Sequence, residues 1–191
     1  MELTKIKISK ATKEQAPEIA RVIMMAMTDE CCQYFCGEGY GLDDFYRMMS
    51  HLVEREDSQY SYKNTLVAMD GQQVVGVSVS YDGSRLHELR CAFIEAAKTY
   101  IGKDHTGMED ETQAGELYLD SLAVQPDYRR QGIARALLLA TKERAGQYGL
   151  PHVGLLVDTD NPNGEALYSS VGFQYVGEKR WGGHFMKHML L

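Results

Sequence analysis

The chain has 191 residues, of which 44% are hydrophobic and 25% are charged, which is the ordinary balance of a globular protein that needs neither disulfides nor a metal for stability. Its net charge of −7 argues against nucleic-acid binding and is compatible with a cationic substrate, although solubility alone explains a surplus of this size. The sequence has no apolar run of about 20 residues and no signal-peptide core near its start, so we expect a cytoplasmic protein that does not bind membranes.

The first half predicts a strand, two helices and a hairpin. Residues 5–9 alternate apolar and polar side chains, which indicates a strand. Residues 13–27 and 42–55 each place apolar side chains at helical spacing. Residues 64–82 contain two β-rich runs around an Asp-Gly pair at 70–71, which is the strongest short signal for a hairpin.

The second half continues the mixture of helices and strands. Residues 85–102 predict an amphipathic helix, which is followed by an acidic loop over 103–116. The later elements expected are strand 117–124, helix 132–148, strand 152–157, helix 161–170 and a terminal hairpin of 173–181 and 184–190. Because strands and helices mingle throughout, without a repeat or a linker, we expect one domain of mixed α/β class over residues 1–191.

The strand after the acidic loop changes the parity of its apolar side chains. Leu117 and Leu119 share one face, whereas Leu122 and Val124 share the other. A side-chain period of two cannot produce this shift without an extra residue, so we expect a β-bulge between Asp120 and Leu122. Bulges reorient backbone groups and often lie beside active sites.

A basic loop then opens the next helix. Its residues are Arg129, Arg130, Gln131 and Gly132. Glycine has no Cβ, so a ligand can approach the backbone closely, and the N–H groups from about Gln131 to Arg135 can converge on a phosphate at the helix start. The loop is neither a P-loop nor the three-glycine dinucleotide motif. Taken alone, it could also be a solvated, positively charged turn.

Residues 116–181 resemble the GNAT superfamily of acyl-CoA-dependent N-acyltransferases. Arg129, Gly132 and Ala134 match the R/Q-x-x-G-x-G/A signature that follows a bulged strand in that family, although many members have glycine where Ala134 stands. The downstream residues that match the family pattern are Asn161, Ala166, Leu167, Tyr168, Gly172 and Phe173. The resemblance implies a mostly antiparallel mixed sheet of six or seven strands, with a splayed central pair and helices on both faces. Residues 85–115 look like an insertion before the bulged strand.

The resemblance also implies how acetyl-CoA would bind. Its pyrophosphate would lie on the loop and the helix start, formed by Arg129, Arg130, Gln131, Gly132, Ile133, Ala134 and Arg135. Its pantetheine arm would lie between the splayed strands and pair with the backbone of Leu122, Ala123 and Val124. The N–H of Leu122 would polarise the thioester carbonyl. Asn161 would hydrogen-bond the pantetheine arm, and it could equally cap the helix that follows it.

Three residues are candidates for proton transfer in the reaction that the resemblance implies, direct attack of an amine on the thioester in a ternary complex. Tyr168 would also bind the donor, with its hydroxyl group at the thioester sulfur, and would protonate the departing thiolate, although it could equally be a packed aromatic residue. The acceptor amine is protonated at neutral pH and must lose a proton before it attacks. Asp120, nearest the bulge, is the first candidate for the base and Glu116 the second; either could be ordinary surface charge.

The sequence does not favour a metal site. Of its four cysteines, three lie in the stretch CCQYFC, and the second spaced pair that a zinc site needs is missing. His184 and His188 would lie about 13 Å apart along one strand, which is too far to share an ion. We therefore expect reduced thiols and no metal.

The acceptor is expected to be an amine of a small molecule or a protein. Segment 85–115 could cover its site, form a homodimer contact, or be a solvated insertion. The segment offers four acids that suit a cationic acceptor: Asp104, Glu109, Asp110 and Glu111. Two other functions stay open from the sequence, a non-catalytic acyl-CoA sensor on the same scaffold and, with less support, a nucleotide-binding module.

Overall fold

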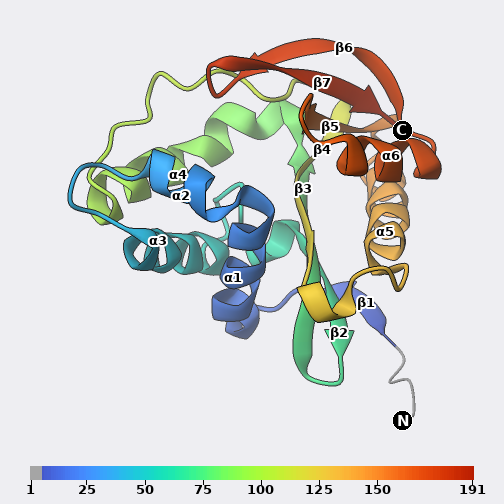
Figure 1. Ribbon diagram of the computed structural model, residues 1–191, viewed down its shortest axis with the longest axis horizontal. Helices are drawn as coiled ribbons and strands as arrows, with labels where there is room; N and C mark the ends of the chain where they lie inside the picture. Colours follow the sequence, from blue (N-terminus) through green and yellow to red (C-terminus); the bar gives the residue numbers. More distant parts are fainter. Residues whose placement is uncertain (1–5) are drawn as a thin grey trace.

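The computed structural model describes residues 6–191 and contains one seven-stranded sheet in the order β1-β2-β3-β4-β5-β7-β6 (Figure 1). The strands are β1 (Lys7–Lys10), β2 (Thr65–Asp70), β3 (Gln73–Asp82), β4 (Glu116–Val124), β5 (His152–Asp158), β6 (Gln174–Trp181) and β7 (His184–Leu190). Neighbouring strands are antiparallel except β4 and β5, which are parallel. The mixed, mostly antiparallel sheet expected from the sequence is therefore confirmed.

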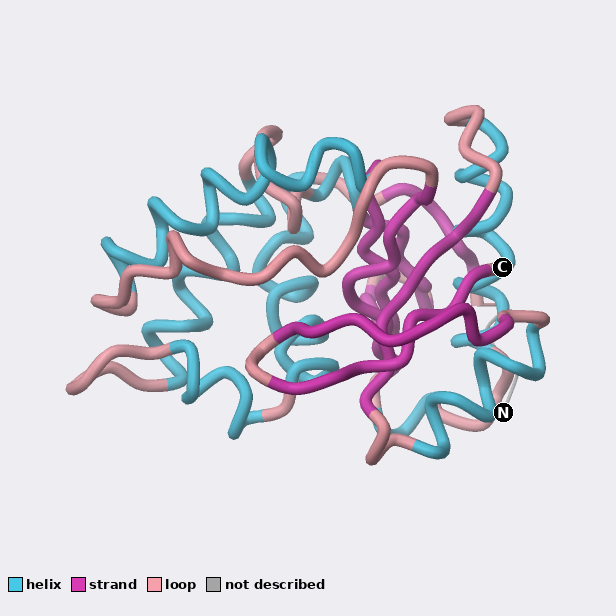
Figure 2. Tube along the Cα trace, turned by 90° about the horizontal axis from the view of Figure 1, so that it is seen from above, coloured by secondary structure: helices cyan, strands magenta, loops and turns pink. Residues whose placement is uncertain are grey.

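Six α-helices cover the two faces of this sheet within the described residues. They are α1 (Ala16–Met27), α2 (Asp29–Phe35), α3 (Leu42–Glu54), α4 (Leu86–Tyr100), α5 (Ile133–Gln147) and α6 (Pro162–Val171). Helices α1 to α4 lie on one side of the strands, whereas α5 and α6 lie on the other (Figures 1 and 2). The helix α1 contacts β3 and β4, and α5 contacts β2 to β5.

Helix α2 is an element that the sequence did not predict. Its side chain at Cys32 is buried, Cys36 directly follows the helix, and all four cysteines of the chain are free thiols. Burial raises the pKa of the Cys32 thiol to about 12, so this thiol stays protonated at neutral pH. The expected first strand begins two residues later and ends one residue later than predicted, at Lys7–Lys10, and residue 5 lies outside the described residues.

Two apolar layers hold the helices to the sheet. On one side, α1 and α3 bury Ile19, Ile23 and Phe45 in a cluster that includes Val77 of β3. On the other side, α5 buries Leu138 with β4 and β5 residues. Each side chain of this size that is fully buried contributes about 1.5–3 kcal/mol. The amphipathic stripes read from the sequence thus fix which face of each helix meets the sheet.

The bulge expected in the central strand lies at Asp120. Strand β4 pairs with β3 along its length, with Ser121 opposite Val79 and Leu119 opposite Ser80, so Asp120 is the extra residue. The parity change in the sequence has this origin, and the prediction is confirmed. Because a bulged strand bends, β4 turns away from its next neighbour after this point.

The parallel pair β4 and β5 is splayed. Only three residue pairs join these strands, Glu116 with His152, Leu117 with Val153, and Tyr118 with Gly154. Beyond Tyr118, the edge of β4 that faces β5 has no strand partner among the described residues, over positions 119–124. This open edge is where an extended ligand could add to the sheet.

The outer strand β6 carries a bulge of its own. Tyr175 lies opposite Met189 and Gly177 opposite His188, which leaves Val176 as the extra residue. No helix among residues 6–191 combines the length and the apolar composition that a bilayer crossing needs.

Candidate active site

The bulge residue Asp120 projects a carboxylate into an enclosed polar network. Its Oδ1 accepts a hydrogen bond from Ser121 Oγ at 2.9 Å, and its Oδ2 accepts one from Gln59 Nε2 at 3.4 Å. Burial raises the pKa of Asp120 to about 7, and the negative charge of Glu111 adds to this effect. A carboxyl group that titrates near neutral pH suits a general base.

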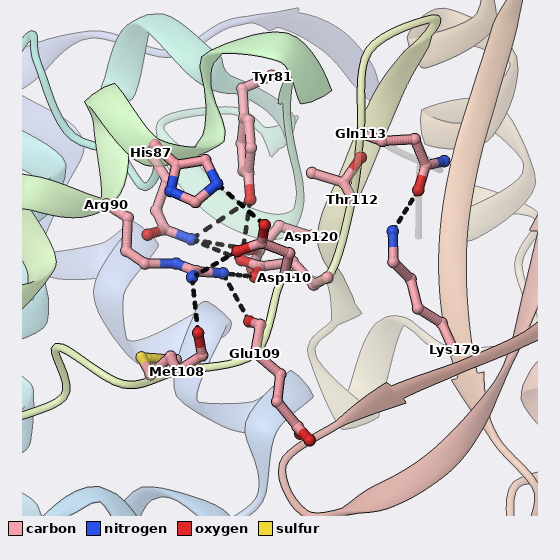
Figure 3. Close-up of polar contacts among 12 residues, drawn as sticks. Tyr81, His87, Arg90, Met108, Glu109, Asp110, Thr112, Gln113, Asp120 and Lys179 are labelled. Carbon is pink, nitrogen blue, oxygen red and sulfur yellow. Dashed lines mark hydrogen bonds and ion pairs between the residues drawn. The ribbon is translucent and has the colours of Figure 1, made fainter.

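Segment 85–115 supplies the charges beside this carboxylate (Figure 3). Glu111 Oε1 accepts hydrogen bonds from Tyr81 Oη at 3.1 Å and from Gln59 Nε2 at 3.2 Å. The guanidinium of Arg90 pairs with Glu111 and, at 3.1 Å, with Asp110. Both Arg90 and Glu111 are buried. Gln59 therefore bridges the bulge carboxylate to a buried ion pair.

Three buried tyrosines surround the same carboxylate, Tyr60, Tyr81 and Tyr118. Burial raises the pKa of each well above its ordinary value, and the charges of Asp120 and Glu111 raise it further. The rings of Tyr81 and Tyr118 meet edge to face at 5.7 Å. These phenols therefore stay protonated, and they give the base an environment of low polarity.

Glu116, the second candidate for the base, is held in a closed contact at the start of β4. His188 Nε2 lies 2.7 Å from its Oε2, and Thr112 Oγ1 donates to its Oε1 at 2.5 Å. Burial acts to raise the pKa of Glu116, but the hydrogen bonds from His188 and Thr112 outweigh burial and lower it. The lowered pKa and the two hydrogen bonds indicate a structural role for Glu116, which links β4 to β7 through His188.

The basic loop has the backbone that an anion site requires. Arg130 and Gly132 have φ values of +60° and +81°, in the left-handed region. A Cβ on Gly132 would meet no protein atom within 4 Å, so the space beside it is open. The first N–H to close a turn of α5 is that of Ala136, which donates to Gly132 O at 3.0 Å. The N–H groups of the preceding residues therefore remain available at the helix start.

The side chains of the loop mostly fix its shape. Arg129 Nε donates to Val124 O at 3.0 Å, and Gln131 Nε2 donates to Asp127 O at 3.2 Å. Arg135 Nη1 donates to Ser170 O at 3.1 Å and so ties α5 to α6. The side chain of Ile133 is buried, whereas those of Arg130 and Gln131 are exposed and that of Ala134 is partly exposed.

Asn161 caps helix α6, as one of its two expected roles required. Its Oδ1 accepts a hydrogen bond from the Gly164 N–H at 2.9 Å. A Cβ on Gly164 would come within 2.6 Å of Asn161 Nδ2, so the glycine leaves room for the cap. A contact between Asn161 and pantetheine stays a prediction.

Tyr168 lies on α6, packed against the apolar cluster between the sheet and α5. Its ring meets Phe173 edge to face at 5.7 Å. Burial raises the pKa of Tyr168, and its hydroxyl group makes no hydrogen bond within residues 6–191. The structure thus shows the packing that was the alternative role of Tyr168. Its role as the general acid stays a prediction.

The histidines of β7 bind carboxylates on separate strands. His184 Nε2 lies 3.1 Å from Asp158, whereas His188 binds Glu116. In the part of the chain that is described, no three His, Cys, Asp or Glu side chains form a cluster that could hold a metal.

The sequence pattern did not predict three members of the network around Asp120: Gln59, Tyr81 and Arg90. Gln59 lies in an irregular segment after α3, where no periodicity exists. Arg90 had a detectable signal, because it stands on the buried face of α4 between Leu86 and Phe93. A charge inside an apolar stripe predicts a buried partner.

A bulged strand that splays from a parallel neighbour, with a helix start and a glycine-containing basic loop directly after it, defines the fold of acyl-CoA-dependent N-acyltransferases. The family model "Acetyltransferase (GNAT) family" matches residues 26–173, and the chain belongs to this family. The resemblance seen in the sequence is thereby confirmed.

Similar proteins match parts or all of the chain. A mycothiol acetyltransferase from Kocuria rhizophila is 40% identical over 72 residues, which are 38% of this chain and 23% of that protein. A [ribosomal protein bS18]-alanine N-acetyltransferase from Escherichia coli is 41% identical over 65 residues, or 34% and 44% of the two chains. The chain thus spans about a quarter of the length of the first relative and less than half of the length of the second. A solved structure described as an acetyltransferase has a TM-score of 0.81 and 29% identity, and the match covers 96% of this chain and 97% of the other.

Proposed function

We propose that this protein transfers an acetyl group from acetyl-CoA to a primary amine of a small molecule or a protein, by direct attack in a ternary complex. Family membership supports this reaction, and the two relatives are named for acetyl transfer with mycothiol, a small molecule, and for acetyl transfer to an alanine of ribosomal protein bS18. The observation that carries the proposal is the bulge at Asp120, whose carboxyl group titrates near neutral pH beside the unpaired edge of β4.

In this proposal one domain over residues 1–191 binds the donor through its backbone. The N–H groups at the start of α5 hold the pyrophosphate, as a helix start does for an anion. Leu122, Ala123 and Val124 pair with the amides of pantetheine as a further strand would. The Leu122 N–H points a fixed dipole at the carbonyl oxygen, where negative charge develops. Asn161 adds a hydrogen bond to the same arm.

The proton transfers fall to two side chains in this mechanism. Asp120 takes a proton from the ammonium group of the acceptor, directly or through water, so that nitrogen attacks the carbonyl carbon. The carbon–sulfur bond then breaks, Tyr168 donates its hydroxyl proton to the departing sulfur, and the second proton lost by the attacking nitrogen passes through water to restore the hydroxyl group of Tyr168. Glu116 is the weaker candidate for the base, because His188 and Thr112 already occupy its oxygens.

Thiol release from acetyl-CoA, measured with a panel of primary amines between pH 5 and 9, tests the proposal. We expect kcat to rise as the pH passes about 7, the pKa of Asp120, and then to level off. Asp120→Asn should remove this rise and reduce kcat on the order of 10²–10⁴-fold. Asp43→Asn, at an exposed position of α3, is the matched control. Binding of acetyl-CoA without thiol release for any amine would favour the acyl-CoA sensor instead.

A further inference from the structure

A pocket of about 420 Å³ lies between three parts of the chain that are distant in sequence. Its walls come from the end of α2, from residues 103–109 and from the turn between β6 and β7. This volume falls in the range of about 300–1,000 Å³ that small-molecule sites occupy. The pocket contains none of the residues assigned above to acetyl-CoA.

The floor of the pocket is aromatic. Phe35 lies 5.2 Å from the ring of His105 and 6.2 Å from that of Trp181, measured between centroids. Tyr34 and Met108 complete the apolar lining. His105 Nε2 lies 2.9 Å from Phe35 O, and burial lowers the pKa of His105, so the imidazole is neutral near pH 7.

The charged groups around the pocket are bound within the chain. Lys103 donates to Tyr34 O at 2.8 Å and lies over the Tyr34 ring. Asp104 forms an ion pair with Lys98, and both side chains are exposed to solvent. Glu109 pairs with Arg180 at 2.9 Å and accepts from the Gly183 N–H at 3.1 Å.

The four acids that the sequence offered for a cationic acceptor are all paired in this way. Asp104 and Glu109 have the partners just described. Asp110 binds His87 and Arg90, and Glu111 binds Arg90, Tyr81 and Gln59. The pocket therefore offers rings and a thioether to a ligand, rather than a free negative charge.

The pocket wall continues into the network of the base. Glu109 precedes Glu111 by two residues, which span at most about 7 Å. Arg90 donates to Met108 O at 3.2 Å and to Glu109 O at 2.8 Å, and it pairs with Glu111. Gln59 then joins Glu111 to Asp120. Arg90 therefore binds both the pocket wall, at Met108 and Glu109, and the carboxylate of Glu111 near the base.

We propose that this pocket holds an apolar or aromatic group next to the acceptor amine, so that the preferred substrates are primary amines with a bulky apolar substituent rather than polyamines. The proposal rests on the proposed transferase function. The occupant follows from the aromatic lining, from the absence of an unpaired carboxylate among the lining residues described, and from the connection to Asp120 through Arg90 and Gln59.

The experiment uses the single tryptophan of the chain, Trp181, which lines the pocket. The fluorescence of the whole protein is titrated with 2-phenylethylamine, ethylamine and putrescine, and thiol release from acetyl-CoA is measured with the same amines. We expect saturable fluorescence changes with 2-phenylethylamine at concentrations at least tenfold lower than with ethylamine. The value of kcat/KM should also be at least tenfold higher for 2-phenylethylamine than for ethylamine or putrescine.

Two variants and a control link these effects to the pocket. Gly107→Leu adds a side chain at the pocket wall, where a Cβ would meet no atom within 4 Å, and Tyr34→Ala removes an exposed ring. Each should reduce kcat/KM for 2-phenylethylamine at least fivefold and leave that for ethylamine and the KM for acetyl-CoA unchanged. Gly146→Leu on α5, where a Cβ is equally free of contacts, is the control and should change none of these values.

The outcomes separate this proposal from the transferase function. Thiol release with equal kcat/KM for the three amines, or with a preference for putrescine, would overturn the pocket proposal and leave the transferase function in place. Saturable fluorescence changes without thiol release for any amine would overturn the transferase function, and the acceptor role of the pocket with it.

Discussion

The hydroxyl group of Tyr168 is the smallest feature on which the mechanism depends. The ring is packed against Phe173, but the hydroxyl group makes no hydrogen bond within the described chain. We expect Tyr168→Phe to reduce kcat at least tenfold, which corresponds to about 1.4 kcal/mol in the activation barrier. The melting temperature should hardly change, since the substitution removes no hydrogen bond within residues 6–191. The measurements are single-turnover thiol release and a thermal melt.

Wild-type kcat in Tyr168→Phe, under conditions in which chemistry is rate-limiting, would contradict the role of this tyrosine as the acid. A large fall in the melting temperature would instead show that the hydroxyl group has a structural partner. Unchanged affinity for acetyl-CoA is the control for donor binding.

Asp120 should also make stability depend on pH. Because burial raises its pKa in the folded protein to about 7, the native state binds this proton more tightly than the unfolded state does. Its contribution is fully present below the unfolded pKa of about 3.9 and is lost as the pH rises towards 7. We therefore expect Asp120→Asn to melt at a higher temperature than the wild type at pH 8, and by a smaller margin at pH 5. A margin that is equal at the two pH values would contradict the raised pKa.

At the scale of the element, the start of α5 makes a prediction with a matched control. Gly132→Glu places a charged side chain with φ near +81° in the open space beside the helix start. It should abolish coenzyme A binding in calorimetry, since the new carboxylate would face phosphate. Gly149→Glu, at φ +69° after the same helix and equally free of contacts, carries the same strain and charge. It should lower stability by a similar amount and leave binding intact.

If both variants bound coenzyme A with wild-type affinity, the start of α5 would not be the phosphate site. If both lost binding, the cause would be a general effect of strain or charge. Only a loss confined to Gly132→Glu supports the proposed site.

Segment 85–115 should tune the base through Glu111. Removing its charge in Glu111→Gln removes a neighbour that raises the pKa of Asp120, so the rise of kcat with pH should move to lower pH. The variant should also be less stable, because it leaves the buried Arg90 without its closest partner. Glu88→Gln, which breaks the exposed pair between Glu88 of α4 and Arg85 directly before that helix, is the control and should change neither the pH profile nor the stability. A pH profile that stays in place would limit Glu111 to a structural role.

The sequence predicted elements well where local pattern decides them. The hairpin at 70–71 and the bulge at Asp120 follow from residue types within a few positions of each other. Helix α2 was missed because its seven residues, DECCQYF, are too few to show a helical period. The ion-pair partners of the acids in segment 104–111 were also missed. These partners lie on α4 and β6, where no local pattern identifies them.

At the scale of the whole molecule, the gap between β4 and β5 predicts a large effect of the donor on stability. Only three residue pairs join these strands, and acetyl-CoA in the proposed position would contact both sides of the gap. Ligand at about 100 times its Kd stabilises the folded state by about 2.7 kcal/mol, or about 5–10 °C for a chain of this length. Differential scanning fluorimetry measures this shift, and Gly132→Glu should abolish it. A shift equal in that variant would place the donor elsewhere.

The bulge at Val176 has a consequence for how the chain meets its neighbours in a crowded solution. An outermost strand normally offers a row of unpaired N–H and C=O groups, on which another chain can continue the sheet and begin to aggregate. In β6 the extra residue interrupts this row, and Glu178, Lys179 and Arg180 place charges after it. The opposite edge, β1, has only four residues and carries a lysine at each end. Both borders of the sheet therefore disfavour edge-to-edge polymerisation, so a pair of copies would have to associate through faces rather than through a shared ladder.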